Sequence, residues 1–210
     1  MKAYRNRVFP LLELGLYISF LAADIWHLGD STPLKFVSIC LCALTALLGA
    51  DSRDGRFVAA AQCLTVWADW FLLVRGRDYA LGVGFFLLVQ LTYLLRMAAL
   101  RGAFSKGGLA LRAVAFLGAV MVLWSGDPLS ALALFYFANL LVNLLEAAAL
   151  GERVFAWGLA LFVCCDLCVG LWNVPIRPAL TEFARVGMWL FYLPSQVLIV
   201  LSAHRKGESP

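Results

Sequence analysis

Residues 154–172 read VFAWGLALFVCCDLCVGLW, a run of 19 residues with a single charged side chain, Asp166. A helix needs roughly 20 mainly apolar residues to cross the hydrocarbon core of a bilayer. This stretch therefore predicts a transmembrane helix with an ionisable group inside it. An acid in such a segment is costly to bury, and it is a candidate for a transport pathway or a reaction site.

The rest of the chain repeats this pattern. Its 210 residues are 63% hydrophobic and only 14% charged, whereas a soluble domain is about half apolar and about a quarter charged. We expect an all-α, polytopic membrane bundle of about eight helices that forms one domain over residues 1–210. The predicted spans are 9–28, 34–50, 57–74, 79–97, 109–125, 129–149, 154–172 and 183–203.

Lys and Arg cluster beside the apolar runs, where they indicate topology rather than a nucleic-acid partner. If the N-terminus is inside, 12 of the 17 basic residues fall on inner segments, so both termini are predicted to be cytoplasmic. Residues 1–8 look like the start of a signal peptide. The apolar run behind them is longer than a typical signal sequence, which favours a retained first helix.

Three acids lie within apolar stretches: Asp24, Asp69 and Asp166. Their helices all run outward in this topology, and each acid precedes the outer end of its helix by a few residues. The three carboxyl groups are therefore expected at similar depth, as one layer if the helices face one cavity. Burial favours the neutral form of a carboxylic acid, so one acid could serve as a proton donor beside an ionised one. The alternative is that each acid only bonds a structural partner.

Other polar side chains share helix faces. Gln90 and Tyr93 are three residues apart, and Tyr192 and Gln196 are four apart. They are expected to orient a substrate or a water, or to bond neighbouring helices. Pro194 cannot donate to the carbonyl of Leu190 and is expected to kink its helix. A third polar stripe consists of Asn139, Asn143 and Glu146.

The spans show a faint internal repeat. Asp69 on the third span is followed by Phe86-x-x-x-Gln90 on the fourth, and Asp166 on the seventh is followed by Tyr192-x-x-x-Gln196 on the eighth. An offset of four helices predicts two parallel four-helix repeats.

No metal site or cofactor is expected. Cys165 and Cys168 form a C-x-x-C pair, but buried cysteines usually behave as small hydrophobes. His27 and His204 both lie near span ends, where capping or interfacial roles are expected, and two histidines cannot build a three-histidine zinc site.

Several of these residues form a family pattern. Ala68-Asp69-Trp-Phe-Leu72, then Gly82-x-x-x-Phe86-x-x-x-Gln90-x-x-Tyr93, resembles the YhhN-like lysoplasmalogenases, which show Gly-Asp-x-x-Leu and Gly-x-x-x-Phe-x-x-x-His-x-x-Tyr. Phe162-Val-Cys-Cys-Asp166 is similar to the family's Phe-x-x-Ser-Asp. Tyr192-Leu-Pro-Ser-Gln196-Val-Leu-Ile199 is similar to its Tyr-x-x-x-Gln-x-Leu-Ile. The resemblance covers roughly residues 34–203.

The resemblance implies an eight-helix membrane enzyme that hydrolyses the vinyl-ether bond of lysoplasmalogens, with membrane lipids as partners and a lysophospholipid as substrate. By resemblance, Asp69 and Asp166 are the candidate catalytic residues. The candidate substrate-binding residues are Gln90, Tyr93, Tyr192 and Gln196, to which the polar residues Asp24, Asn139 and Asn143 are added. The chain departs from the pattern at Ala68, Cys165 and above all Gln90, which stands where the family usually has His.

Three functions remain open from the sequence. The first is an intramembrane lipid hydrolase that uses Asp69 and Asp166 as acid and base. The second is a small-molecule or proton-coupled transporter that uses the same acids as a relay. The third is an inactive lipid-binding member of the family, because Gln90 cannot transfer a proton at neutral pH as a histidine can.

Overall fold

The computed structural model describes residues 7–173 and 178–203 and confirms the all-α bundle. The described residues form eight helices, of which α3 continues into a short π-helix, η2: α1 (Phe9–Trp26), α2 (Thr32–Leu48), α3 (Arg53–Asp69), η2 (Trp70–Val74), α4 (Tyr79–Arg101), α5 (Lys106–Trp124), α6 (Pro128–Ala149), α7 (Arg153–Asn173) and α8 (Pro178–Leu201). Every predicted span coincides with one of these helices. Most of residues 1–8, and the predicted role of His204, lie outside the described residues.

Helix ends differ from the predicted spans where a polar first turn extends the helix beyond its apolar part. Helix α3 begins at Arg53 because the Ser52 side chain accepts a bond from the amide of Gly55, at 2.8 Å. Ser105 caps α5 in the same way, through the amide of Gly108. His27 is the C-cap of α1 in the left-handed conformation, as its end-capping prediction requires.

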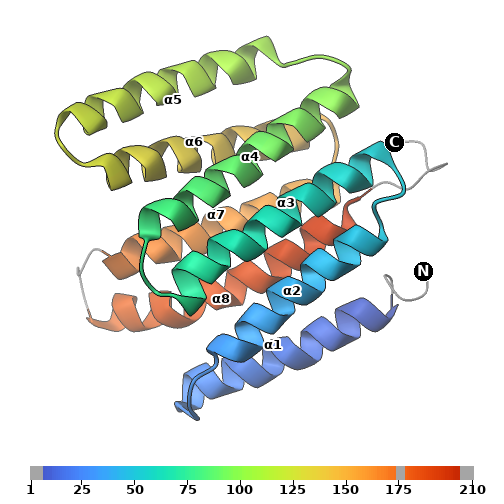
Figure 1. The fold of residues 1–210 in the computed structure, drawn as a ribbon, viewed down its shortest axis with the longest axis vertical. Coiled ribbons are helices and arrows are strands. Elements are labelled where there is room, and N and C mark those ends of the chain that lie inside the picture. The colour runs from blue at the N-terminus through green and yellow to red at the C-terminus, as the bar shows by residue number, and fades with distance from the viewer. Residues whose placement is uncertain (1–6, 174–177, 204–210) are drawn as a thin grey trace.

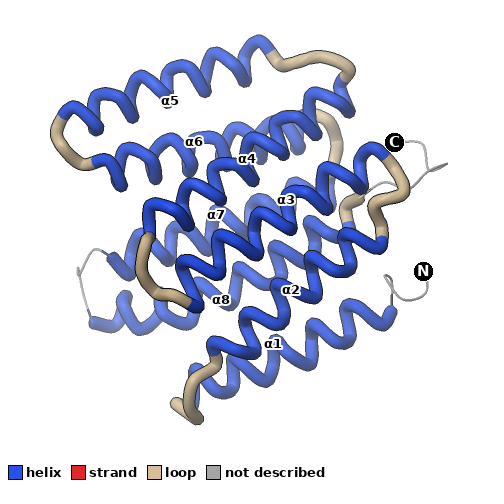
Figure 2. Tube along the Cα trace, in the orientation of Figure 1, coloured by secondary structure: helices blue, strands red, loops and turns tan. Residues whose placement is uncertain are grey.

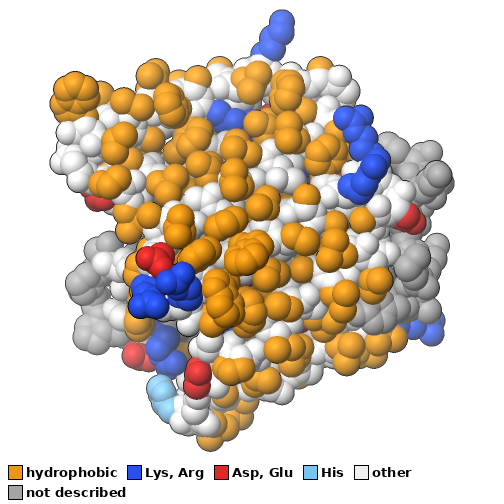
Figure 3. All heavy atoms as spheres, viewed as in Figure 1, with side chains coloured by type: hydrophobic (Ala, Val, Ile, Leu, Met, Phe, Trp, Pro, Cys, Tyr) orange, Lys and Arg blue, Asp and Glu red, His pale blue; other side chains and the backbone are white. Residues whose placement is uncertain are grey.

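Seven of the described helices, with η2 counted as part of α3, are long and apolar enough to cross a membrane, and α2 is a shorter apolar helix. Figure 3 shows hydrophobic side chains over the middle of one face, with most of the visible charged side chains toward the two ends of the helices. The protein is therefore a multi-pass membrane protein. Which end faces the cytoplasm stays a prediction.

The helices pack as two layers, with α2, α3 and α4 in front of α6, α7 and α8, and with α1 and α5 at the edges (Figures 1 and 2). We call the end at which α1 begins and α8 finishes the proximal end, on the right in Figure 1, and the opposite end the distal end. Helix α8 contacts α1, α2, α3 and α7, while α5 packs chiefly on α6.

Several helix contacts recur with an offset of four, which is compatible with the predicted parallel repeat; the repeat itself stays a prediction. The contacts of α1 with α2, α2 with α3, and α3 with α4 correspond to those of α5 with α6, α6 with α7, and α7 with α8. The contact of α2 with α8 likewise corresponds to that of α6 with α4. Asp69 and Asp166 therefore lie on helices that each pack against the preceding and the following helix.

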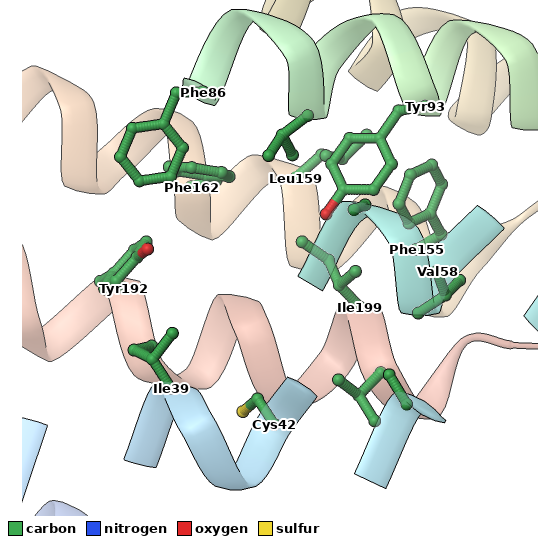
Figure 4. Close-up of a cluster of buried hydrophobic side chains, with 14 of the residues drawn as sticks. Ile39, Cys42, Val58, Phe86, Tyr93, Phe155, Leu159, Phe162, Tyr192 and Ile199 are labelled. Atoms are coloured by element: carbon green, nitrogen blue, oxygen red, sulfur yellow. The ribbon is translucent and has the colours of Figure 1, made fainter. Parts of the chain in front are cut away.

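The core is aromatic and is centred between the two layers. Phe86 of α4 and Phe162 of α7 face Tyr192 of α8, and Tyr93 packs edge-on against Phe155 (Figure 4). Close packing of α7 on α8 depends on Gly158, where an added Cβ would lie 2.9 Å from the Ile199 side chain and 3.2 Å from the Ser195 carbonyl.

Candidate active site

Asp69 is the last residue of α3 and is buried in the core. Its carboxyl oxygen Oδ2 accepts a hydrogen bond of 2.7 Å from the hydroxyl of Tyr192 on α8. The helix changes to π geometry directly after Asp69, over Trp70–Val74, with the Arg75 amide bonded to the Trp70 carbonyl. Short π-helical segments within helices are frequent at functional sites. The structure thus joins two of the predicted site residues directly.

Asp166 occupies a corresponding place on α7. Its Oδ2 accepts a 2.6 Å bond from the hydroxyl of Tyr136, a buried residue of α6. Asp166 itself is only partly buried. Tyr136 was not among the residues predicted from the sequence. An aromatic residue in an apolar span reads as core packing, and its hydroxyl bond depends on the packing of α6 against α7.

An aromatic wall connects the two acid–tyrosine pairs. The ring of Phe86 lies 5.8 Å from that of Tyr136 and 6.3 Å from that of Tyr192, centroid to centroid. In the described part of the chain no hydrogen bond joins the two carboxyl groups to each other. The arrangement is therefore two acids in one cluster, each held by its own phenol on either side of Phe86.

Asp24 has different partners from the other two acids. Its carboxyl group forms an ion pair with Lys35 at 2.7 Å and accepts a bond from Ser31, and its backbone carbonyl accepts a bond from Arg185. The ammonium group of Lys35 lies 5.1 Å from the ring centroid of Trp189, which in turn packs on Tyr192. Asp24 is thus linked to Tyr192 indirectly, through Lys35 and the ring of Trp189.

Gln90, Asn139 and Asn143 belong to a second buried network, centred on Arg112 of α5. The Asn143 amide nitrogen donates to both oxygens of Gln90, at 2.8 Å to the carbonyl and 3.0 Å to the side chain. Arg112 donates to Asn139, Asn143 and Glu146. Arg112 of α5 therefore bonds all three residues of the polar stripe of α6, and the middle one, Asn143, also holds Gln90 of α4.

Gln196 and Tyr93 are buried, but each has a polar side-chain atom without a hydrogen-bond partner among the described residues. Gln196 accepts a 2.9 Å bond from Gln62 of α3, a residue that the sequence analysis did not single out. Within the described residues, the side-chain nitrogens of Gln90 and Gln196 and the hydroxyl of Tyr93 have no hydrogen-bond partner. Buried polar groups are normally bonded, so these atoms are available to a water or a ligand.

The family model of the YhhN family matches residues 31–203, which is most of the chain. The chain belongs to the YhhN family. The search of curated proteins and the search of solved structures found no match. The match includes Asp69, Tyr93, Asp166, Tyr192 and Gln196, together with Tyr136 and Arg112.

Pro194 shows how this YhhN-family chain accommodates a proline in the middle of α8. The helix continues from Pro178 to Leu201 with Pro194 inside it. The carbonyl of Leu190, which Pro194 cannot bond, instead accepts a 2.9 Å bond from the hydroxyl of Tyr17 on α1. A side chain of α1 thus replaces the missing backbone bond next to Tyr192.

Sequence reasoning missed three buried charged residues of this family member: Arg96, Arg112 and Glu13. Arg96 and Arg112 were counted only as topology signals near span ends, yet both are almost completely buried. Arg96 makes two bonds to Asp54 of α3 and two to Ser202. Glu13 of α1 accepts a bond from Cys42, and its place inside an apolar run was a signal of the kind that identified Asp24.

Two hollows lined by described residues lie at the proximal end, and Asp69 and Asp166 line neither of them. One, of about 310 Å³, lies between α6 and α7, and the other, of about 190 Å³, lies between α4, α5 and α6. The described residues contain no group of three or more His, Cys, Asp or Glu side chains suited to holding a metal ion. The chemistry that the site itself offers is that of carboxyl, phenol and amide groups.

Proposed function

We propose that this protein is an intramembrane hydrolase that cleaves the vinyl-ether bond of lysoplasmalogen-type lysolipids and releases a fatty aldehyde and a glycerophospho-base. The observation that carries the proposal is the pair of acids, Asp69 and Asp166, each bonded to a tyrosine hydroxyl in a common aromatic cluster. Membership of the YhhN family supports it. The sequence motifs around both acids resemble those of the family's lysoplasmalogenases.

The reaction requires one proton donor and one group that stabilises positive charge. A neutral carboxyl group protonates the carbon end of the vinyl-ether double bond, which leaves an oxocarbenium ion. The ionised carboxylate stabilises this cation, as a carboxylate does in glycosidases. Water then adds to the cation and loses a proton to the carboxylate formed in the first step. The resulting hemiacetal collapses to aldehyde and alcohol.

The tyrosines have a definite role in this scheme. A phenol that donates to a carboxyl oxygen fixes the orientation of the group and leaves its second oxygen for substrate. Tyr192 does this for Asp69 and Tyr136 does it for Asp166. The apolar rings of Phe86 and Phe162 surround the cluster and favour a hydrocarbon chain over water. We assign no fixed order of acid and base to the two carboxyl groups.

The test is aldehyde release from a lysoplasmalogen by the purified full chain in detergent. Asp69→Asn and Asp166→Asn are each expected to lower the rate by at least about 100-fold, the usual contribution of a general acid or base. Asp78→Asn is the matched control, because Asp78 is an exposed acid in the loop before α4. Release that persists in both core variants, or that is absent from folded wild type, contradicts the proposal.

Gln90 favours a second candidate, an inactive lipid-binding member. Its side chain is fully buried and its amide nitrogen lacks a partner among the described residues, at the position where the family usually has His. If a proton-transferring group has been lost there, Gln90→His is expected to create or raise aldehyde release. If Gln90 only positions substrate, wild type is active and Gln90→His lowers or leaves unchanged its rate. The transporter hypothesis stays a prediction.

A further inference from the structure

The surroundings of Asp69 are closed to lipid. Asp69 is 5% exposed and its partner Tyr192 is 4% exposed, so a hydrocarbon chain cannot touch either group while the helices stay in place. Neither residue lines the two hollows at the proximal end. A lipid therefore reaches Asp69 only if two neighbouring helices separate, and the packing around Tyr192 indicates which two.

A series of aromatic rings leads from Tyr192 to the edge of the bundle. Trp189 of α8 packs edge-on against Tyr192, with 5.3 Å between ring centroids, and Phe20 of α1 packs edge-on against Trp189 at 5.6 Å. Tyr17 of α1 packs in turn against Phe20. Helix α1 lies at the edge of the bundle and packs chiefly on α2 and α8 (Figure 1). These rings therefore separate Tyr192 from the lipid along the boundary between α1 and α8.

Helix α8 has a weak point at this boundary. Pro194 has no amide hydrogen for the carbonyl of Leu190, so a backbone bond is missing in the turn that carries Tyr192. Helices bend at such positions. The hydroxyl of Tyr17 supplies the missing bond to this carbonyl, at 2.9 Å. One hydroxyl group of α1 thus secures the turn of α8 that holds Tyr192 against Asp69.

Another border of the site is packed in a different way. Leu72 of η2 fills the space over Gly82 of α4, where an added Cβ would collide with it. Across the boundary between α1 and α8, by contrast, the side chains of Tyr17 and Arg185 donate to backbone carbonyls. Single hydrogen bonds between membrane helices contribute little stability. Of the two borders, the one between α1 and α8 is therefore the easier to open.

We propose that a single-chain lipid enters between α1 and α8 to reach Asp69, and that the bond from Tyr17 to the Leu190 carbonyl is the latch of this entrance. When the hydroxyl releases the carbonyl, α8 bends at Pro194 and the aromatic rings of α1 and α8 separate. The hydrocarbon chain then occupies the space between the two helices, with its first carbons beside Asp69. Leu190 is exposed on the surface of the bundle, so the latch lies at the lipid-facing side of this boundary.

The experiment measures how fast Asp69 reacts with dicyclohexylcarbodiimide in the purified full chain in detergent. This apolar reagent adds to neutral carboxyl groups from the detergent phase, and peptide mass spectrometry separates the adducts of Asp69 and Asp166. Tyr17→Phe keeps the ring but removes the hydroxyl. It is expected to raise the rate at Asp69 about threefold, the usual effect of losing one hydrogen bond between membrane helices. The rate at Asp166, which lies on α7, is expected to stay unchanged.

Pro194→Ala is the second variant, because alanine restores the missing amide hydrogen. Helix α8 is then expected to bond the Leu190 carbonyl itself, so adding Tyr17→Phe to Pro194→Ala is expected to leave the rate at Asp69 unchanged. Tyr79→Phe is the matched control, since Tyr79 is an exposed tyrosine at the start of α4.

Three results overturn the proposal. The first is an unchanged rate at Asp69 in Tyr17→Phe, or the same increase in Tyr79→Phe. The second is an equal increase at Asp69 and Asp166, which indicates general loosening of the bundle. The third is a threefold effect of Tyr17→Phe that persists together with Pro194→Ala.

Only the identity of the entering lipid rests on the proposed function, and the two fail separately. Faster labelling of Asp69 in Tyr17→Phe, in a protein that releases no aldehyde, supports the entrance and contradicts the hydrolase. Aldehyde release by wild type, together with an unchanged labelling rate in Tyr17→Phe, supports the hydrolase and overturns the entrance.

Discussion

The two halves of the molecule hold their acids in different ways although several of their helix contacts correspond. In the first half, Asp69 of α3 accepts its bond from Tyr192 of α8. The position that corresponds to Tyr192 in the other half is Phe86, which has no hydroxyl. Asp166 of α7 instead accepts its bond from Tyr136 of α6. The same helix arrangement therefore supports two different acid environments.

The two repeated glutamines, Gln90 and Gln196, also have different hydrogen-bond partners. Gln196 bonds Gln62 of α3, whereas Gln90 bonds Asn143 of α6. Helix α6 thus supplies the polar partners of both Asp166 on α7 and Gln90 on α4, and its polar stripe also bonds Arg112. Similar helix contacts therefore do not produce similar hydrogen bonds. Two side chains of α6, Tyr136 and Asn143, bond Asp166 and Gln90, and this makes their surroundings differ from those of Asp69 and Gln196.

The largest expected effect on stability concerns the contact between Arg96 of the first half and Ser202 of the second. Arg96 and Ser202 are corresponding positions, since each lies six residues after the repeated glutamine, and they bond each other. Arg96→Gln and Asp54→Asn are each expected to lower the free energy of unfolding by about 3–5 kcal/mol, because each breaks the ion pair between the fully buried Arg96 side chain and the Asp54 carboxylate. Denaturant unfolding of the purified protein in detergent measures this.

Two variants give this first prediction its controls. Arg56→Gln removes an exposed arginine and is expected to change stability little. Ser202→Ala is expected to cost less than Arg96→Gln, because Arg96 keeps both bonds to Asp54 and the bond to the Ser202 carbonyl. Equal stability of Arg96→Gln and wild type would show that the two halves do not depend on this contact.

The two tyrosines test the comparison directly. Tyr192→Phe is expected to lower the free energy of unfolding by about 1–2 kcal/mol, because it leaves the buried Asp69 without its donor. Tyr136→Phe is expected to cost less, since Asp166 is less completely buried than Asp69 and its carboxyl group is less costly to leave without a donor. Equal losses, measured by unfolding in detergent, argue against a difference between the two acid environments.

A double variant sharpens this second prediction. Because Phe86 of α4 is the counterpart of Tyr192 of α8 in the repeat, Phe86→Tyr places a hydroxyl on α4 at the position where α8 has one. Phe86→Tyr is therefore expected to recover part of the stability lost in Tyr136→Phe. No recovery, with Phe86→Tyr alone folded normally, would show that the ring of residue 86 does not reach Asp166.

The smallest expected effect concerns the N-terminal cap of α6, the helix that supplies the partners of Asp166 and Gln90. Asp127 caps α6 by accepting a bond from the Ser130 amide, at 3.0 Å. Ser31, at the corresponding start of α2, makes no such cap. Asp127→Ala is expected to lower the midpoint of thermal unfolding slightly, and Asp127→Asn less, because asparagine also caps helices well.

This last effect depends on pH. The bonds from the side chain and the backbone of Ser130 hold the pKa of Asp127 below its usual value of 3.8. Since the native pKa is the lower one, the contribution is present above pH 3.8 and is lost as the pH falls through the native pKa. The difference between wild type and Asp127→Ala is therefore expected to shrink in acid, and a constant difference contradicts a capping carboxylate.

The sequence by itself determined the helices. Apolar runs long enough for a bilayer, with capping residues such as Ser52 and Ser105 at their ends, are local features, because a helix satisfies its own backbone hydrogen bonds. The sequence also identified both acids, since a charged residue inside an apolar run is conspicuous wherever the helix packs. The correspondence of helix neighbours agrees with the repeat that the sequence shows.

Only the tertiary structure decided which groups these residues bond. Tyr136 is an ordinary aromatic residue in a span until α6 packs on α7 and brings its hydroxyl to Asp166. Arg112 is an ordinary topology signal until α5 packs on α6 and buries it against Asn139, Asn143 and Glu146. Such bonds join residues of different helices, so their geometry depends on packing that no single stretch of sequence contains.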